Sequence, residues 1–473
     1  ARIAEVPFSS TYKFMATLNR EQKNTTLYVK GAPEVILQKA THYLVDGKEK
    51  KLTNKQQKFF MAKANELAEQ GFRTLALGYK QFDTAQKNIN KKDVTHIVFA
   101  GVVAIADPVR FDVKDTLQKA RQAGIRVVMI TGDHAKTAKA IGEHLGLIGE
   151  DDMVCEGSEI ETLSELELQK KVMQTYVFAR VAPEHKIRIV RAFQALGEVV
   201  SMTGDGVNDA PAIKGADIGV AVGSGTDVAK ETADMVLLDD SFSTIVAAVE
   251  EGRGVYQNIK KVVLYLLSGS FAEVVMITGS IIAGFPVAAL PAQILWVNII
   301  EDAFPTMALA FEKGDKENMK DSPRKKSEPL IDKEMKTMIV IKTIVANVLL
   351  FSIFVYFYKT TGDIVLTRTI VFVGFAIDAL FYIFSIRSLR HMIWQMNPFQ
   401  NMYLVAAVVF GWIMLILAIY WSPLQLLLRT VPLSSFHWII MVCFGVVNLV
   451  LIEIIKGIFI VRNIHKKTIF KRT

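Results

Sequence analysis

The sequence has 473 residues and a net charge of +8, and 51% of its residues are hydrophobic. Its mean hydropathy of +0.29 is high for a protein that is soluble throughout. Charged residues occur throughout residues 1–261, and long apolar runs follow, with charges mostly between them. The pattern excludes a wholly soluble chain and predicts a soluble part joined to a membrane part. Cys155 and Cys443 lie far apart, which argues against a disulfide framework and a cysteine-based metal site.

Residues 1–95 are predicted to form a small α/β module. The stretch "TTLYVKGAPEVIL" (25–37) is typical of a strand, a turn and a helix that begins near Pro33. The stretch "EQGFRTLALGYKQF" (69–82) predicts a second strand. An aromatic side chain with cationic neighbours suits a nucleotide, although exposed lysines often belong only to a solvated surface. The candidates for such a pocket are Phe8, Lys13, Lys30 and Arg73.

Between residues 96 and 250, short apolar runs alternate with helical patterns. The candidate strands are 96–107, 125–133, 176–180, 198–206, 218–222 and 235–239. Helical stretches such as 111–123 and 134–145 lie between several of them. This alternation predicts a parallel sheet wrapped by helices, in which the chemistry gathers at the carboxyl ends of the strands.

Two glycine-bearing motifs follow predicted strands of this sheet, "MITGD" (129–133) and "MTGDGVNDAP" (202–211). Glycine lets the backbone approach a ligand, and a helix N-terminus suits a phosphate. Asp205 and Asp209 suit Mg²⁺, which takes one or two carboxylates plus phosphate oxygens. Lys186 could give a phosphoryl group a positive partner. Each motif taken alone is equally compatible with a structural loop.

Six apolar segments of about 20 residues are long enough to span a bilayer. They are approximately 262–284, 291–311, 338–358, 367–386, 402–421 and 436–461. Connecting loops rich in Lys and Arg alternate with loops that are poor in them. Because basic loops stay on the cytoplasmic side, this pattern places residues 1–261, the loops at 312–337 and 387–401, and the C-terminus in the cytoplasm. The basic charge beside apolar runs therefore indicates topology and not a nucleic-acid partner. We expect a multi-pass protein of the plasma membrane.

Polar residues inside these segments are costly and are candidates for function. They are Ser270, Glu273, Asn298, Glu301, Asp302 and Asp378. Pro305 frees a backbone carbonyl near Glu301, so main-chain and side-chain oxygens could converge there. Carboxylate-rich clusters suit hard cations, which favours an ion pathway. The alternative interpretation is a buried hydrogen-bonded network that holds no ion.

Several motifs, in this order, resemble those of P-type cation-transporting ATPases. They are "KGAPE" (30–34), "DPVR" (107–110), "MITGDH" (129–134), "FARVAPEHK" (178–186) and "TGDGVNDAPAIKGADIGVAVGSGTDVAKETADMVLLDD" (203–240). The stretches "LLSGSFAEVV" (266–275) and "LPAQILWVNIIEDAFPTMALAFE" (290–312) resemble the fifth and sixth membrane helices of type II pumps, which include calcium pumps and sodium/potassium pumps. The likeness covers most of the chain.

The resemblance implies a fold in three parts. Residues 1–95 would be a partial nucleotide-binding domain. Residues 96–250 would be the C-terminal part of a phosphorylation domain, with a Rossmann-type parallel sheet like that of haloacid dehalogenases. Residues 251–473 would be an all-α membrane domain of six helices. The cofactors implied are ATP and Mg²⁺.

The resemblance also implies roles for matching residues. Asp205 would hold Mg²⁺ at a phosphorylation site that Asn208 and Asp209 shape. The residues near the transferred phosphoryl group would be Thr131, Gly132, Asp133 and Lys186. Adenine would stack on Phe8, and the nucleotide pocket would be lined by Lys13, Lys30 and Arg73. The family's DPPR-like motif would contribute Asp107 and Arg110, with Val109 in place of its second proline.

In the membrane, the residues that match cation ligands of the family are Glu273, Asn298, Asp302 and Asp378. Ser270 stands where calcium pumps typically carry Asn, and Glu301 stands where they often carry Thr. Ca²⁺ is the leading candidate for the transported ion. Na⁺, K⁺ and Mn²⁺ are alternatives, because the two departures leave ion identity open.

The family's nucleophile lies in a DKTGT motif and its actuator domain carries a TGE loop, and neither motif occurs here. We therefore expect the C-terminal portion of a pump, inactive by itself, whose partners are the missing N-terminal portion, the lipid bilayer and the transported cation. Two other hypotheses stay open. One is a phosphohydrolase-type domain on a membrane anchor, and the other is a non-catalytic membrane regulator with a pump-like shape.

Overall fold

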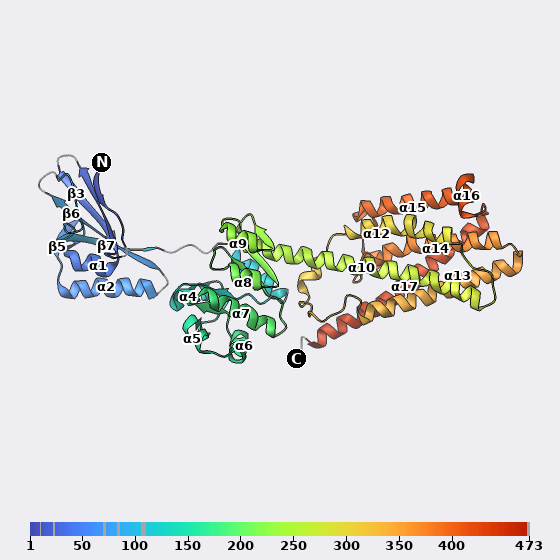
Figure 1. Cartoon of the computed structure of the whole chain (residues 1–473), viewed down its shortest axis with the longest axis horizontal. Helices are drawn as coiled ribbons and strands as arrows, with labels where there is room; N and C mark the ends of the chain where they lie inside the picture. The colour runs from blue at the N-terminus through green and yellow to red at the C-terminus, as the bar shows by residue number, and fades with distance from the viewer. Residues whose placement is uncertain (10, 22–23, 70–71, 83–85, 106–109, 471–473) are drawn as a thin grey trace. The chain divides into compact units, whose positions relative to one another are not determined.

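The computed structural model describes residues 1–9, 11–21, 24–69, 72–82, 86–105 and 110–470 (Figure 1). It divides into two compact units, Ala1–Val246 and Ala247–Thr473. The first unit mixes strands and helices, and the second is helical. An α/β part followed by a helical membrane part was the predicted fold class, and it is confirmed. The domain boundaries at 95 and 250 stay predictions.

A seven-stranded sheet in the order β1-β2-β3-β6-β7-β4-β5 opens the first unit. Its strands are β1 (Arg2–Val6), β2 (Phe14–Glu21), β3 (Asn24–Gly31), β4 (Ala40–Val45), β5 (Lys48–Lys51), β6 (Arg73–Phe82) and β7 (Ile97–Ile105). Helices α1 (Pro33–Lys39) and α2 (Asn54–Glu69) cover one face of it (Figure 1). The expected strand, turn and helix around "KGAPE" are confirmed by β3 and α1. Helix α1 begins at Pro33, since proline suits the first turn of a helix.

One predicted strand belongs to a different sheet from the one expected. Residues 96–107 were assigned to the parallel sheet of the following segment. Instead, β7 pairs antiparallel with β6 and parallel with β4 in the first sheet. Apolar periodicity identifies a strand but not its partner, so that assignment was wrong.

The rest of the first unit contains two three-stranded parallel sheets, in the orders β8-β10-β9 and β11-β12-β13. Their strands are β8 (Met129–Ile130), β9 (Cys155–Glu156), β10 (Val177–Ala179), β11 (Ser201–Gly204), β12 (Ile218–Val222) and β13 (Met235–Leu237). The intervening helices are α3 (Val113–Gln122), α4 (Ala135–His144), α5 (Gly157–Thr162), α6 (Glu165–Gln174), α7 (Pro183–Ala195), α8 (Ala210–Gly215) and α9 (Asp227–Thr232). Parallel pairing with alternating helices is confirmed, but the single predicted sheet is wrong, because the described strands form two sheets. The short strand β9 was not foreseen.

Within the residues that the structure describes, five helices are long and apolar enough to cross a membrane. They are α10 (Phe242–Ile282), α13 (Lys333–Thr361), α14 (Ile364–Ile386), α15 (Met402–Tyr420) and the first part of α17 (Ser435–Phe470). The shorter elements of this region are α16 (Ser422–Leu428) and the single-turn segments η2 (Lys316–Lys320), η3 (Ile393–Gln395) and η4 (Pro398–Gln400).

The expected second span, 291–311, is helical but interrupted. It consists of α11 (Pro291–Trp296), the π-helix η1 (Val297–Asp302) and α12 (Ala303–Ala310). Six uninterrupted spans are therefore not confirmed. Pro305 has no amide hydrogen to donate to a carbonyl one turn earlier, and the π-helix ends three residues before it. Such interruptions are frequent at functional sites, and this one carries Asn298 and Asp302.

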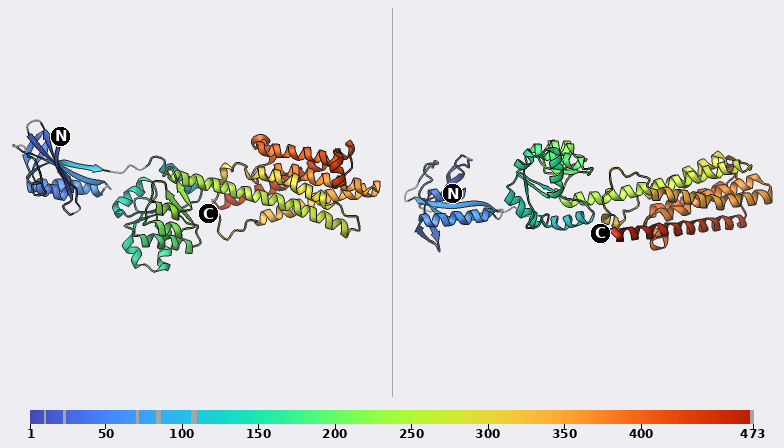
Figure 2. Two further views of the ribbon diagram at one scale, coloured as in Figure 1. Left: turned by 45° about the horizontal axis from the view of Figure 1, so that its top comes forward. Right: turned by 90° about the horizontal axis from the view of Figure 1, so that it is seen from below.

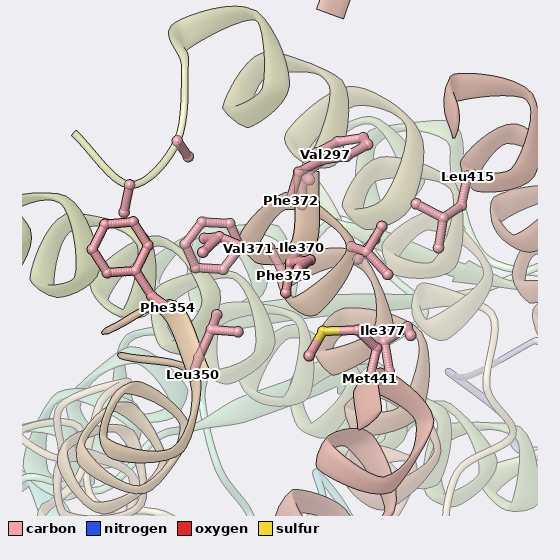
Figure 3. Packing of buried hydrophobic residues seen from close by; sticks show 14 of the residues in the cluster. Val297, Leu350, Phe354, Ile370, Val371, Phe372, Phe375, Ile377, Leu415 and Met441 are labelled. Carbon is pink, nitrogen blue, oxygen red and sulfur yellow. The ribbon is translucent and has the colours of Figure 1, made fainter. Parts of the chain in front are cut away.

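Helix α14 is the most buried of the five long apolar helices in the described part of the chain. It packs against α13, α15 and α17, and 83% of its most apolar 18-residue stretch is buried inside the protein. Figure 2 shows the long helices of this unit running side by side. Figure 3 shows Phe372, Phe375 and Ile377 of α14 among Leu350, Leu415 and neighbouring side chains. An acidic residue on this helix, such as Asp378, therefore needs a partner inside the protein.

Candidate functional site

The loop after β11 is folded around the carboxylate of Asp209. One oxygen, Oδ2, accepts the backbone amides of Asp205 and Gly206 at 3.3 and 3.5 Å. A Cβ atom at Gly204 would lie 2.4 Å from the Cβ of Asp209, so only glycine fits there. The glycine-rich sequence thus lets the backbone close onto Asp209 just before α8 begins.

The other oxygen of Asp209 accepts a hydrogen bond from the ammonium of Lys186, on the first turns of α7. Asp209 is 6% exposed. Burial acts to raise the pKa of Asp209, but the hydrogen bond and charge of Lys186, together with the two loop amides, outweigh it and lower the pKa. Asp209 is therefore a fixed anion that anchors the loop to α7.

This arrangement predicts how protection of the loop amides depends on pH. Because the folded pKa of Asp209 lies below its ordinary value of 3.8, its stabilisation is complete above that value and is lost as the pH falls through the folded pKa. We expect Asp209→Asn to reduce hydrogen-exchange protection of the Asp205 and Gly206 amides by roughly tenfold at neutral pH. The difference between wild type and variant should shrink below about pH 4.

Hydrogen exchange read by mass spectrometry on a peptide that spans 201–210, corrected for intrinsic exchange, measures this effect. Asp217→Asn is the matched control, since its carboxylate accepts the amide of Val200, which precedes the probed peptide and lies outside the Asp209 loop. Equal protection of the loop in wild type and Asp209→Asn at neutral pH would contradict the anchoring role.

The side chains of Asp205 and Asn208 are exposed. The Asp205 carboxylate makes no hydrogen bond or ion pair within the described part of the chain, so a hard oxygen donor is available there. In that part, no three His, Cys, Asp or Glu side chains form a group that could hold a metal ion. Mg²⁺ commonly takes only one or two protein carboxylates, with water and phosphate oxygens as its other ligands. The donor set therefore fits Mg²⁺ held together with a phosphate.

The second motif forms a compact turn at the end of β8. The Thr131 hydroxyl donates to Asp133 Oδ2 at 3.0 Å and accepts the Asp133 amide at 3.1 Å. The carbonyl of Thr131 accepts the amide of Val181 at 3.1 Å. Since Val181 lies two residues before the start of α7, the turn that includes Gly132 lies beside the beginning of the helix that carries Lys186. Within the described residues, no hydrogen bond joins the turn to Lys186 itself.

The predicted nucleotide residues lie on the first sheet and its loops. Phe8 is 66% exposed, and Lys30 on β3 and Arg73 on β6 are also exposed. Lys30 pairs in register with Leu77, four residues from Arg73, so both cations lie on one face of the sheet. Lys13 has a positive φ of 53° and lies 3.4 Å from Glu34. This leaves Phe8, Lys30 and Arg73 open to a ligand.

The DPPR-like motif is only partly visible. Asp107 and Val109 lie outside the described residues. The Arg110 guanidinium donates to the carbonyl of Asp240, at the end of the long signature. A positioning contact of this kind does not by itself make Arg110 a nucleotide ligand.

In the second unit, acids from two helices meet. Asn298 Nδ2, on η1, donates to Glu273 Oε2, on α10, at 3.3 Å. Asp302 Oδ1 accepts the Tyr265 hydroxyl at 3.1 Å. Glu273 and Asp302 are 8% and 5% exposed. Asn298 therefore contacts Glu273 directly, and Asp302, on the same π-helix as Asn298, contacts α10 through Tyr265.

A cavity of about 20 Å³ lies between these helices and α13 and α14. Its polar lining consists of Tyr265, Glu273, Asp302, Lys342, Asp378 and Tyr382. A cavity of this size holds about one water-sized occupant. Ser270 is exposed and does not line it, because Gly269 and Ala272 occupy the inward face of α10. The Glu301 side chain lies outside the described part of the chain.

Sequence reasoning missed Lys342 and Tyr265. Lys342 stands within the apolar run "MIVIKTIVAN" (338–347), and it is 4% exposed. The rule that singled out intramembrane acids applies equally to a lysine, so the signal was present. Tyr265 carries no such signal, since tyrosine is common at the ends of membrane helices.

The fold and site define a multi-pass membrane protein whose α/β part carries an anion-anchored, glycine-rich loop and whose bundle encloses buried carboxylates. Three family descriptions match the chain: "P-type ATPase, cytoplasmic domain N" over residues 1–112, "haloacid dehalogenase-like hydrolase" over residues 188–249, and "Cation transporting ATPase, C-terminus" over residues 286–458.

Curated relatives agree with these matches. A calcium-transporting ATPase of Bacillus subtilis is 37% identical over 93% of this chain and 50% of its own length. Calcium-transporting ATPase 1 of Bacillus cereus is 38% identical over 96% of this chain and 53% of its own. A calcium-transporting ATPase type 2C member 1 of Bos taurus is 35% identical over 92% and 45%. The chain belongs to the P-type cation-transporting ATPases, and it spans about half the length of the curated relatives it matches.

Proposed function

We propose that this chain provides the nucleotide-binding, phosphoryl-binding and cation-binding residues of an ATP-driven Ca²⁺ pump of the plasma membrane. The observation that carries the proposal is the convergence of Glu273, Asn298 and Asp302 inside the helical bundle. Carboxylate and amide oxygens are the ligands that Ca²⁺ prefers. The relatives named above are calcium-transporting ATPases, which favours Ca²⁺ over Na⁺, K⁺ or Mn²⁺.

In the phosphoryl site, Asp205 would hold Mg²⁺, which would neutralise phosphate charge when bound. Lys186, fixed by Asp209, would place a positive charge beside the transferred group. Asn208 would shape the exposed loop, and the 131–133 turn would face the same group. The aspartate that accepts the phosphoryl group belongs to a DKTGT motif, which this sequence does not contain.

ATP hydrolysis by a fusion tests the proposal. This chain replaces the matching region of the Bacillus subtilis relative, and the fusion is reconstituted in lipid vesicles with Mg²⁺ and ATP. Micromolar Ca²⁺ should stimulate hydrolysis and be accumulated, whereas Na⁺, K⁺ and Mn²⁺ should not replace it. Stimulation by Na⁺ or Mn²⁺ alone would overturn the ion assignment. A folded fusion with no cation-stimulated hydrolysis would favour the non-catalytic regulator.

Nucleotide binding can be tested on the chain itself. We expect Lys30→Ala to weaken ATP binding by roughly tenfold, because an exposed lysine loses its charge-assisted hydrogen bond to phosphate. Fluorescence of a trinitrophenyl ATP analogue, displaced by ATP, measures the affinity. Lys50→Ala on β5 is the matched control, since that lysine is exposed on the far edge strand of the same sheet. Similar affinities of the two variants would contradict the assignment of Lys30.

A further inference from the structure

A lysine is buried in the helical bundle beside the candidate cation ligands. Lys342 on α13 is 4% exposed, and its Nζ lies 2.7 Å from Asp378 Oδ2 on α14. The ammonium also lies 5.0 Å from the centre of the Tyr382 ring. Burying a charged side chain in a helical bundle raises the free energy of the folded state unless an opposite charge neutralises it. Asp378 supplies that opposite charge to Lys342.

Both oxygens of Asp378 are engaged by protein groups. Oδ2 accepts from Lys342, and Oδ1 accepts from Asn448 Nδ2 on α17. A metal ion at Asp378 would therefore have to share these oxygens with Asn448 and with the positive charge of Lys342. By contrast, within the described residues the hydrogen bonds that Glu273 and Asp302 accept come from neutral groups, Asn298 and Tyr265.

Among the described side chains that line the cavity, the charges then balance for a single divalent ion. Glu273 and Asp302 together carry two negative charges if both are ionised, and one Ca²⁺ neutralises them. The negative charge of Asp378 is already neutralised by Lys342. A second divalent ion would bring an excess positive charge into a region of low dielectric beside a fixed ammonium. The cavity of about 20 Å³ also has room for about one such occupant.

We propose that Lys342 is a built-in cation that occupies Asp378 in place of a transported ion, so that the site takes one divalent cation. Glu273, Asn298 and Asp302 hold that ion, and Lys342 sets the number of ions bound. This inference rests on the proposed cation site and deepens it, by removing Asp378 from the ligand set that the sequence predicted.

Equilibrium binding of radioactive Ca²⁺ to the purified full chain in detergent micelles tests the proposal. We expect one Ca²⁺ per wild-type chain, and two per chain for Lys342→Gln, where Asp378 becomes available. The double variant Lys342→Gln/Asp378→Asn removes both buried charges, which protects the fold. It should bind one Ca²⁺, with an affinity within about threefold of wild type, because two neutral side chains leave the local charge unchanged.

Each other result is decisive. Two ions per wild-type chain, or loss of all binding in the double variant, would overturn the role of Lys342 while the cation site stands. One ion in a folded Lys342→Gln variant would do the same. No Ca²⁺ bound to the folded wild-type chain would overturn the cation site itself, and with it this inference.

Discussion

Asp302→Asn should lower the affinity of the chain for Ca²⁺ by at least about a hundredfold, because it removes a buried negative charge from an ion site in low dielectric. Asp302 is 5% exposed and is held by Tyr265. Asparagine has the same size as aspartate and keeps one carbonyl oxygen. The loss of Ca²⁺ affinity therefore measures the effect of the missing negative charge and not a change in packing. Equilibrium binding of radioactive Ca²⁺ to the purified chain measures the change.

Asp363→Asn is the matched control. The Asp363 carboxylate caps α14 by accepting the amides of Val365 and Leu366 at 2.8 and 3.1 Å. Asparagine caps helices about as well, so this variant should bind Ca²⁺ like wild type. An Asp302→Asn chain that is folded and binds Ca²⁺ with unchanged affinity would show that the ion lies elsewhere.

Lys186→Met should reduce ATP hydrolysis by the fusion with the Bacillus subtilis relative at least about a hundredfold, the usual cost of removing one preorganised donor to developing charge. The substitution removes the ammonium beside Asp209 and leaves that buried carboxylate without its cation. The rate of phosphate release with saturating ATP and Ca²⁺ measures the loss.

Lys171→Met is the control for this variant, since Lys171 also pairs with an acid, Glu159, at 2.5 Å in the same unit but distant in sequence from the loop. It should hydrolyse ATP within about threefold of the unmodified fusion, as surface ion pairs contribute little. To separate chemistry from folding, Lys186→Met/Asp209→Asn should regain protease resistance without regaining activity. Recovery of hydrolysis in that double variant would contradict the role of Lys186.

Much of the fold could be predicted because its signals are local. Pro33 after a turn marks the start of α1, and apolar runs of about 20 residues mark the membrane helices. Strand partners are not local. The run at 96–107 looks like any strand, and only packing joins β7 to β6. The π-helix at Val297–Asp302 could not be predicted either, because Pro305 indicates that the helix is irregular but not which kind of irregularity it contains.

The candidate sites were predicted in the same uneven way. Motif spacing brought Lys186 and Asp209 into one hypothesis, and the structure joins them directly. Periodicity did not show that Ser270 points away from the cavity that Gly269 and Ala272 line. Nor did it show that Asp378 is neutralised by a lysine on another helix. Contacts between elements far apart in sequence depend on helix packing, which residue spacing does not encode.

The most direct test of the account is phosphoenzyme formation from radiolabelled ATP by the fusion protein, with and without Ca²⁺. The account predicts an acid-stable phosphoenzyme that forms only when Ca²⁺ is present and that is lost in Glu273→Gln. The reason is that Ca²⁺ binding in the bundle must control phosphoryl transfer at the Asp205 loop. A phosphoenzyme that forms equally without Ca²⁺, or one that keeps normal Ca²⁺ dependence in Glu273→Gln, would contradict it.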